Sequence, residues 1–206
     1  MLFDILSIIS VLLIIMLLKR LVNIFPSLAA CMVRWKESLN LEASVKHSLD
    51  RNMLAAAMIL PFCLTVTRFG LYSPSFMNGM GENARTAVTI GVFLIYCGLR
   101  MMMSAIIKTH KTSSKAVTAA ERSAFTFFII MTLILIITGW IMSFAGADIG
   151  LTKNAMLWIS ASIYALYLLR KFQIFVSGCS IFAAFLYLCA LEIFPTGALV
   201  ASALIF

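Results

Sequence analysis

The sequence predicts an all-α membrane protein, a polytopic transmembrane helical bundle of about six spans. Its composition is 63% hydrophobic and only 12% charged, whereas soluble domains are about 45–50% apolar and about 25% charged. Long apolar runs recur along the chain, and Lys and Arg gather between them: six lie in 19–51, four in 108–122 and two at 170–171. Because Lys and Arg are enriched in cytoplasmic loops, this spacing predicts an orientation as well as a fold.

The first predicted span, residues 2–18, is apolar except for Asp4, and Lys19 and Arg20 follow it. A cleavable signal peptide has its basic residues before the apolar run. We therefore expect an uncleaved span with its N-terminus outside the cytoplasm. Pro26 is expected to end or bend a helix soon after this span, because proline removes a backbone hydrogen bond.

Five further spans follow from the length that a bilayer requires. An α-helix rises about 1.5 Å per residue, so about 20 residues cross a hydrocarbon core of roughly 30 Å. Pro61 predicts a kink within the second span. The fifth span is short unless it begins nearer Ile149, and Arg170 and Lys171 are expected to form the cytoplasmic turn after it. The predicted spans after the first are 53–72, 86–107, 123–145, 155–169 and 172–193.

The end of the chain is predicted to lie outside the last span. Pro195 follows closely after Glu192 and is expected to help stop the helix. Residues 198–206 are apolar but too few to cross the membrane again. We therefore expect a short re-entrant or interfacial C-terminal tail over 195–206. The chain as a whole, 1–206, is predicted to form a single transmembrane domain with both termini outside.

Three charged residues within or beside the spans are candidate functional residues: Arg68, Arg100 and Glu192. Ionisable groups inside a membrane are costly and mark functional sites by default. Arg68 and Glu192 both fall near the outer ends of predicted spans, so a pair between them would offset their desolvation. If the two residues pair, they form either a gate or polar binding site or a structural contact between helices. If they do not pair, they are two side chains that snorkel independently to the interface. For Arg100, near the centre of the third span, we favour a structural or partner-binding role.

Motifs for catalysis or cofactors are absent from the sequence. It contains no HExxH, GxSxG, Walker A or GxGxxG pattern. The five cysteines are scattered without a CxxC pair, which argues against zinc, and both histidines, His47 and His110, lie in predicted loops rather than at haem-binding depth. We expect a non-enzymatic protein without cofactors. The net charge is +8, and the Lys and Arg residues that produce it lie in loops beside apolar spans. This position indicates contact with lipid headgroups and not with nucleic acid.

Three segments resemble an uncharacterised family of multi-pass inner-membrane proteins of Bacteroidota, known as a domain of unknown function. The segments are Ile59-Leu60-Pro61-Phe62-Cys63 followed by Arg68, Tyr96-Cys97-Gly98-Leu99-Arg100, and Leu186-Tyr187-Leu188-Cys189-Ala190-Leu191-Glu192-Ile193-Phe194-Pro195. The resemblance implies a multi-pass location in the bacterial inner (cytoplasmic) membrane. It implies no activity.

Three functions are open at this point. The first is an accessory or structural subunit of a larger membrane assembly, for example one in protein export or envelope biogenesis. This function is favoured because the loops of the chain are too small for a catalytic domain. The expected partners are the lipid bilayer and other membrane-protein subunits. The alternative is a small-solute or ion transporter or channel that uses Arg68, Arg100 and Glu192, although polar residues in the spans are few and no internal repeat is evident. An enzyme acting on lipid is third, because the groups it needs are dispersed.

Overall fold

The computed structural model describes residues 2–77, 79–107, 114–177 and 180–205. Within these ranges the chain is helical and contains no strand, so the predicted all-α class is confirmed. The elements are α1 (Leu2–Val33), α2 (Trp35–Ala43), α3 (Val45–Arg68), the 3₁₀ turn η1 (Ser75–Met77), α4 (Glu82–Ile107), α5 (Ser114–Phe144), α6 (Ile149–Val176), α7 (Ile181–Leu188), the π-helix η2 (Cys189–Ile193) and α8 (Phe194–Ile205).

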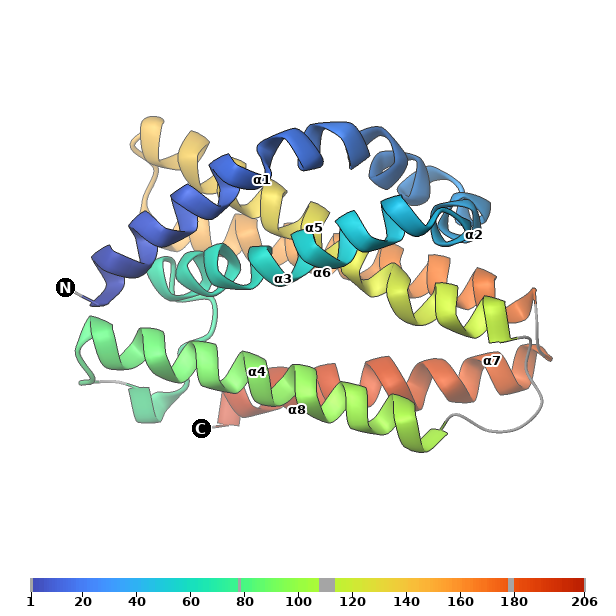
Figure 1. Ribbon diagram of the computed structural model, residues 1–206. Coiled ribbons are helices and arrows are strands. Elements are labelled where there is room, and N and C mark those ends of the chain that lie inside the picture. Colours follow the sequence, from blue (N-terminus) through green and yellow to red (C-terminus); the bar gives the residue numbers. More distant parts are fainter. Residues whose placement is uncertain (1, 78, 108–113, 178–179, 206) are drawn as a thin grey trace.

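Six helical stretches are long and apolar enough to cross a membrane, as predicted. Successive stretches run in opposite directions, and the two termini lie at the same end of the bundle (Figure 1). The chain is therefore a multi-pass membrane protein by its fold. The six stretches are Leu2–Val33, Val45–Arg68, Glu82–Ser104, Thr118–Phe144, Ile149–Val176 and Ile181–Ala203.

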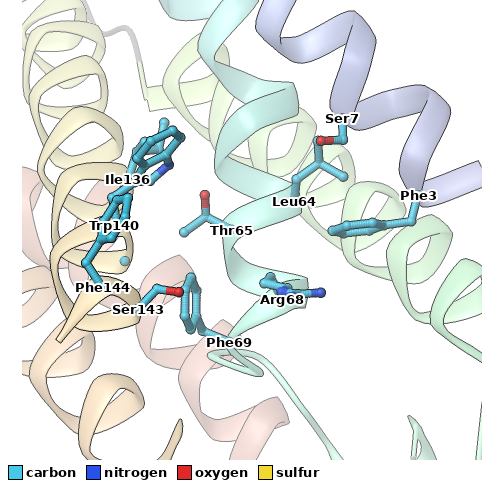
Figure 2. Close-up of a pocket in the computed structure, with 11 residues that line it drawn as sticks. Phe3, Ser7, Leu64, Thr65, Arg68, Phe69, Ile136, Trp140, Ser143 and Phe144 are labelled. Carbon is cyan, nitrogen blue, oxygen red and sulfur yellow. The ribbon is translucent and has the colours of Figure 1, made fainter. Parts of the chain in front are cut away.

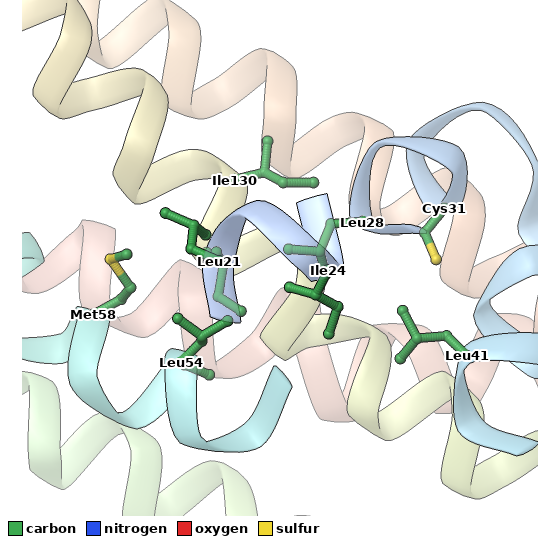
Figure 3. Close-up of a cluster of buried hydrophobic side chains, with 10 residues drawn as sticks. Leu21, Ile24, Leu28, Cys31, Leu41, Leu54, Met58 and Ile130 are labelled. Atoms are coloured by element: carbon green, nitrogen blue, oxygen red, sulfur yellow. The ribbon is translucent and has the colours of Figure 1, made fainter. Parts of the chain in front are cut away.

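The helix α1 is longer than the predicted span 2–18 and continues through Pro26 to Val33. Most of its buried side chains lie in its second half, where they meet α2, α3 and α5. Figure 3 shows this core, in which Leu21, Ile24 and Leu28 of α1 lie among side chains of the other helices. Pro26 does not end the helix, because burial of this apolar stripe outweighs one missing backbone hydrogen bond.

The helix α3 begins earlier than the predicted span 53–72 and ends sooner, at Arg68. Its end is set by Gly70, which has a φ of +60°, a conformation that glycine adopts without steric cost. The amide of Leu71 then reaches back to the carbonyl of Val66 at 3.0 Å, as in a Schellman-type helix end. Pro61 lies within α3 and is buried there.

The helices form two layers in Figure 1, with α4 running beside η2 and α8 below the layer of α1, α3, α5 and α6. Aromatic side chains connect the layers. The ring of Phe93 on α4 lies 5.1 Å from that of Phe62 on α3 and 5.5 Å from that of Phe128 on α5, measured between centroids. Polar contacts made by Tyr96 and Arg100, later on α4, add to these aromatic contacts and belong to the candidate site.

The last two spans differ from their predicted limits. The helix α6 continues beyond 169 to Val176, so the final span begins at Ile181 and not at 172. It then continues through Pro195 to Ala203, which replaces the predicted re-entrant or interfacial tail. The π-helix η2 ends two residues before Pro195, and local π-helical adjustments are one way in which transmembrane helices accommodate a proline. In η2 the amide of Phe194 bonds to the carbonyl of Cys189.

Candidate functional site: a buried charge cluster

The carboxylate of Glu192 is the centre of a charge cluster inside the bundle. Glu192 lies in η2, in the interior of the last span, and its side chain is 1% exposed. Its Oε1 atom accepts a hydrogen bond from Nη2 of Arg100 on α4 at 2.6 Å. The same oxygen accepts one from Nζ of Lys171 on α6. Two cations and one carboxylate thus connect three spans.

Lys171 is a site residue that the sequence did not reveal. It was expected at the cytoplasmic turn with Arg170, but α6 extends five residues past it and its side chain is 2% exposed. Consecutive residues of an α-helix point about 100° apart. Arg170 therefore turns away and donates to the carbonyl of Met32 at 2.9 Å, while Lys171 points to Glu192.

Hydroxyl groups surround the charges. Tyr167, four residues before Lys171 on the same face of α6, accepts hydrogen bonds from Arg100 at 2.6 Å and from Lys171 at 3.2 Å. The hydroxyl of Tyr164 donates to the backbone carbonyl of Glu192 at 3.1 Å. Tyr167 thus accepts from both cations, and a donor without a partner would be costly in a lipid environment.

A further hydrogen bond joins Tyr96 to Thr196 at 3.0 Å. Tyr96 lies four residues before Arg100, and Thr196 lies four residues after Glu192, so each pair occupies one helix face. Each helix of the cluster therefore carries a charged residue and a hydroxyl at four-residue spacing. This spacing is the sequence signal that could have indicated which faces meet.

The cluster carries an excess positive charge, because Arg100 and Lys171 share one carboxylate. The second oxygen of Glu192, Oε2, is buried and has no hydrogen-bond partner within the described residues. Chemically, the arrangement can hold helices together and can accept one more donor at Oε2. Among the described residues, no group of three His, Cys, Asp or Glu side chains could hold a metal ion.

Arg68 does not join this cluster, and the predicted pair between Arg68 and Glu192 is wrong. Arg68 is the last residue of α3 and lies exposed beside a cavity of about 670 Å³ (Figure 2). The prediction assumed that the last span ends at 193, which put Glu192 near the outer end. Because that span extends to Ala203, Glu192 lies deeper than Arg68 and meets Arg100 and Lys171 instead.

A second charge cluster lies at the opposite end of the bundle from the termini. Arg51 on α3 is buried and donates to Oε2 of Glu42 on α2 at 2.9 Å. Arg122 on α5 donates to the other oxygen of Glu42. The sequence showed these residues only as loop charges. Their contacts fasten α2, which is too short to span a membrane, to α3 and α5.

The fold and the cluster define a multi-pass helical membrane protein in which buried ion pairs join three spans. No protein-family model matches the chain, and no curated protein or solved structure shows significant similarity to it.

Proposed function

We propose that the protein is a non-enzymatic accessory or structural subunit of a larger membrane assembly, in which α1 binds a helix of another subunit. The observation that carries this proposal is the exposure of α1. It is the most apolar of the six spans, yet only 11% of its most hydrophobic window is buried inside the bundle. The first half of α1 thus presents an apolar surface that the chain itself does not cover.

One stripe of this exposed surface has the spacing of a helix-packing seam. Four branched side chains follow one another at intervals of three and four residues and are 55–62% exposed: Ile5, Ile8, Leu12 and Ile15. This spacing is that of left-handed helix pairs, in which such side chains interlock, and most transmembrane bundles pack with the same crossing angle. We call these four residues the seam. Their spacing supports the proposal that a helix of another subunit packs beside α1.

The buried charge cluster fits a structural role in such a subunit. Glu192 and Lys171 are enclosed, and the bonds of Glu192 to Arg100 and Lys171 hold α4 and α6 against the last span. The transport alternative places Arg68, Arg100 and Glu192 on one path. Arg68 instead lies beside a separate cavity whose lining includes neither Arg100 nor Glu192, so the arrangement favours the subunit over the transporter.

The proposed location is the bacterial inner membrane, with both termini outside the cytoplasm. This orientation is supported by the cations of the end opposite the termini, such as Arg34, Lys36 and Lys46, which the positive-inside rule places in the cytoplasm. In a cysteine-free background, we expect a cysteine at Met80 to react with an impermeant thiol reagent added to intact cells, and one at Lys36 to react only after lysis. Both positions are exposed. The reverse labelling pattern contradicts the orientation.

Bulky substitutions in the seam are expected to release the partner without unfolding the bundle. Ile8→Trp and Ile15→Trp keep the surface apolar but prevent close interlocking of helices. The matched control is Ile95→Trp on α4, which is 64% exposed and lies outside the seam. After mild detergent extraction from the native host, we expect one stoichiometric membrane protein to copurify with the wild type and the control. We expect at least about a tenfold reduction with the seam variants, because close van der Waals packing is a main source of helix association in membranes.

Two results contradict the proposed function. One is that the wild-type chain purifies alone under conditions that preserve its fold. The other is that seam and control variants retain the same partner equally. Melting temperatures of all variants in detergent establish that the bundle remains folded, so that loss of the partner is not confused with loss of structure.

A further inference from the structure

A cavity near the termini has features that the proposed function does not use. It has a volume of about 670 Å³ and lies between α1, α3 and α5. Figure 2 shows Trp140 and Phe144 of α5 on one side of the cavity and Phe3 of α1 on the other, with Thr65 and Arg68 of α3 between them. This volume is within the range of about 300–1,000 Å³ that is typical of small-molecule sites.

One end of the cavity is cationic. Arg68 is exposed at the end of α3, and it has no ion pair or hydrogen bond among the residues that the structure describes. Since α3 is a membrane span, its last residue lies at the level where headgroups begin. A guanidinium at this level can donate two parallel hydrogen bonds to a phosphate, a strong and specific geometry.

The rest of the cavity is mainly apolar and extends into the span. Leu64 lies one turn deeper than Arg68 on α3, and Ile136 lies two turns deeper than Phe144 on α5. Trp140 and Phe144 are 66% and 85% exposed, which leaves large aromatic faces for a ligand. A cation at headgroup depth above an apolar wall is complementary to an amphipathic anion whose charge is at one end.

We propose that this cavity binds an anionic phospholipid, with its phosphate on Arg68 and one acyl chain along α1 and α5. The bilayer supplies this ligand at high local concentration. In a phospholipid the phosphate lies at headgroup depth and the acyl chain extends into the membrane, as Arg68 and the apolar wall of the cavity do. A zwitterionic lipid places a cationic group beside its phosphate, which weakens the attraction to Arg68. The proposal is independent of any protein partner, because Ile5, Ile8, Leu12 and Ile15 of the seam do not line the cavity.

The test is native mass spectrometry of the full chain in a mild neutral detergent. Phosphatidylglycerol and phosphatidylcholine with identical acyl chains are added to the wild type and to three variants. Arg68→Gln removes the cation, and Ser143→Trp fills the cavity from α5. The matched control is Lys153→Gln, which removes a cation at the same end of the bundle but outside the cavity.

We expect the wild type and Lys153→Gln to retain phosphatidylglycerol at least about tenfold more strongly than phosphatidylcholine, as for a charge-assisted hydrogen bond. Arg68→Gln should lose this preference, and Ser143→Trp should retain neither lipid. Three results overturn the proposal: equal retention of both lipids by the wild type, an unchanged preference in Arg68→Gln, or undiminished phosphatidylglycerol on Ser143→Trp. Melting temperatures in detergent confirm that each variant is folded.

Discussion

Replacing Glu192 with alanine is expected to destabilise the bundle by about 3–5 kcal/mol, the usual cost of removing one partner from a buried ion pair. The carboxylate is the shared counter-charge of Arg100 and Lys171, and it is 1% exposed. Without it, the buried Lys171 and the partly exposed Arg100 keep only the Tyr167 hydroxyl as a hydrogen-bond partner among the described residues. The cost therefore comes mainly from the charges that remain and not from the contacts that are lost.

This origin of the cost predicts a rescue. In the double variant Glu192→Ala/Lys171→Met, one of the two stranded cations is absent, and we expect it to recover part of the lost stability. The surface pair of Arg20 and Asp50 provides a control, because its atoms are 2.9 Å apart but the Arg20 side chain is 46% exposed. Asp50→Ala should therefore cost no more than about 1 kcal/mol.

The measurement is the free energy of unfolding of the purified protein, obtained by titration with a denaturing detergent. If Glu192→Ala costs no more than Asp50→Ala, the buried cluster contributes nothing beyond a surface pair. If the double variant is less stable than Glu192→Ala alone, stranded charge is not the cause of the loss. Either result contradicts the structural role proposed for the cluster.

The number and order of the spans could be predicted from the sequence because each depends on local properties. A helix that crosses a bilayer must satisfy its backbone within about 20 apolar residues, whatever its neighbours are. Cations at 170 and 171, directly after an apolar run, are typical of a cytoplasmic turn. The predicted span 155–169 was short for a bilayer unless it began nearer Ile149, and α6 does begin at Ile149. Its continuation past Lys171 was not predicted, because Arg170 and Lys171 were interpreted as loop residues.

One displaced boundary explains most of the errors at the candidate site. Starting the last span at 172 made it complete at 193, which left residues 195–206 as a tail and put Glu192 level with Arg68. With the start at Ile181, the tail becomes the end of the span and Glu192 moves to its interior. Arg100 and Glu192 could each be identified as candidate residues because they are charged. Their ion pair depends on how the helices are rotated about their axes, and the hydrophobicity of the spans does not predict this rotation.

Inserting one alanine after Ala190 is expected to destabilise the bundle about as much as Glu192→Ala, by about 3–5 kcal/mol. Ala190 lies in η2, where hydrogen bonds span five residues and not four. Such a π-helical segment already holds one residue more than the equivalent α-helix. A further residue rotates the chain on one side by about 100° relative to the other.

The rotation matters because both sides of η2 are anchored. Before it, Ala184 is fully buried against α5 and α6, in a core with Ala120 and Ile174. In and beyond it, Glu192 and Thr196 meet α6 and α4. A helix with this extra residue cannot present both sets of side chains to their partners at once, so the insertion loses either the apolar core or the charge cluster.

The control for this insertion is Ile193→Ala, which lies in the same segment and is 44% exposed. It leaves the register unchanged and should alter the free energy of unfolding by no more than about 0.5 kcal/mol, as at other exposed positions. An insertion variant as stable as this control would show that the register across η2 does not position Glu192. When the insertion is combined with Glu192→Ala, the losses should fall well short of their sum, because both changes remove the same contacts of one carboxylate.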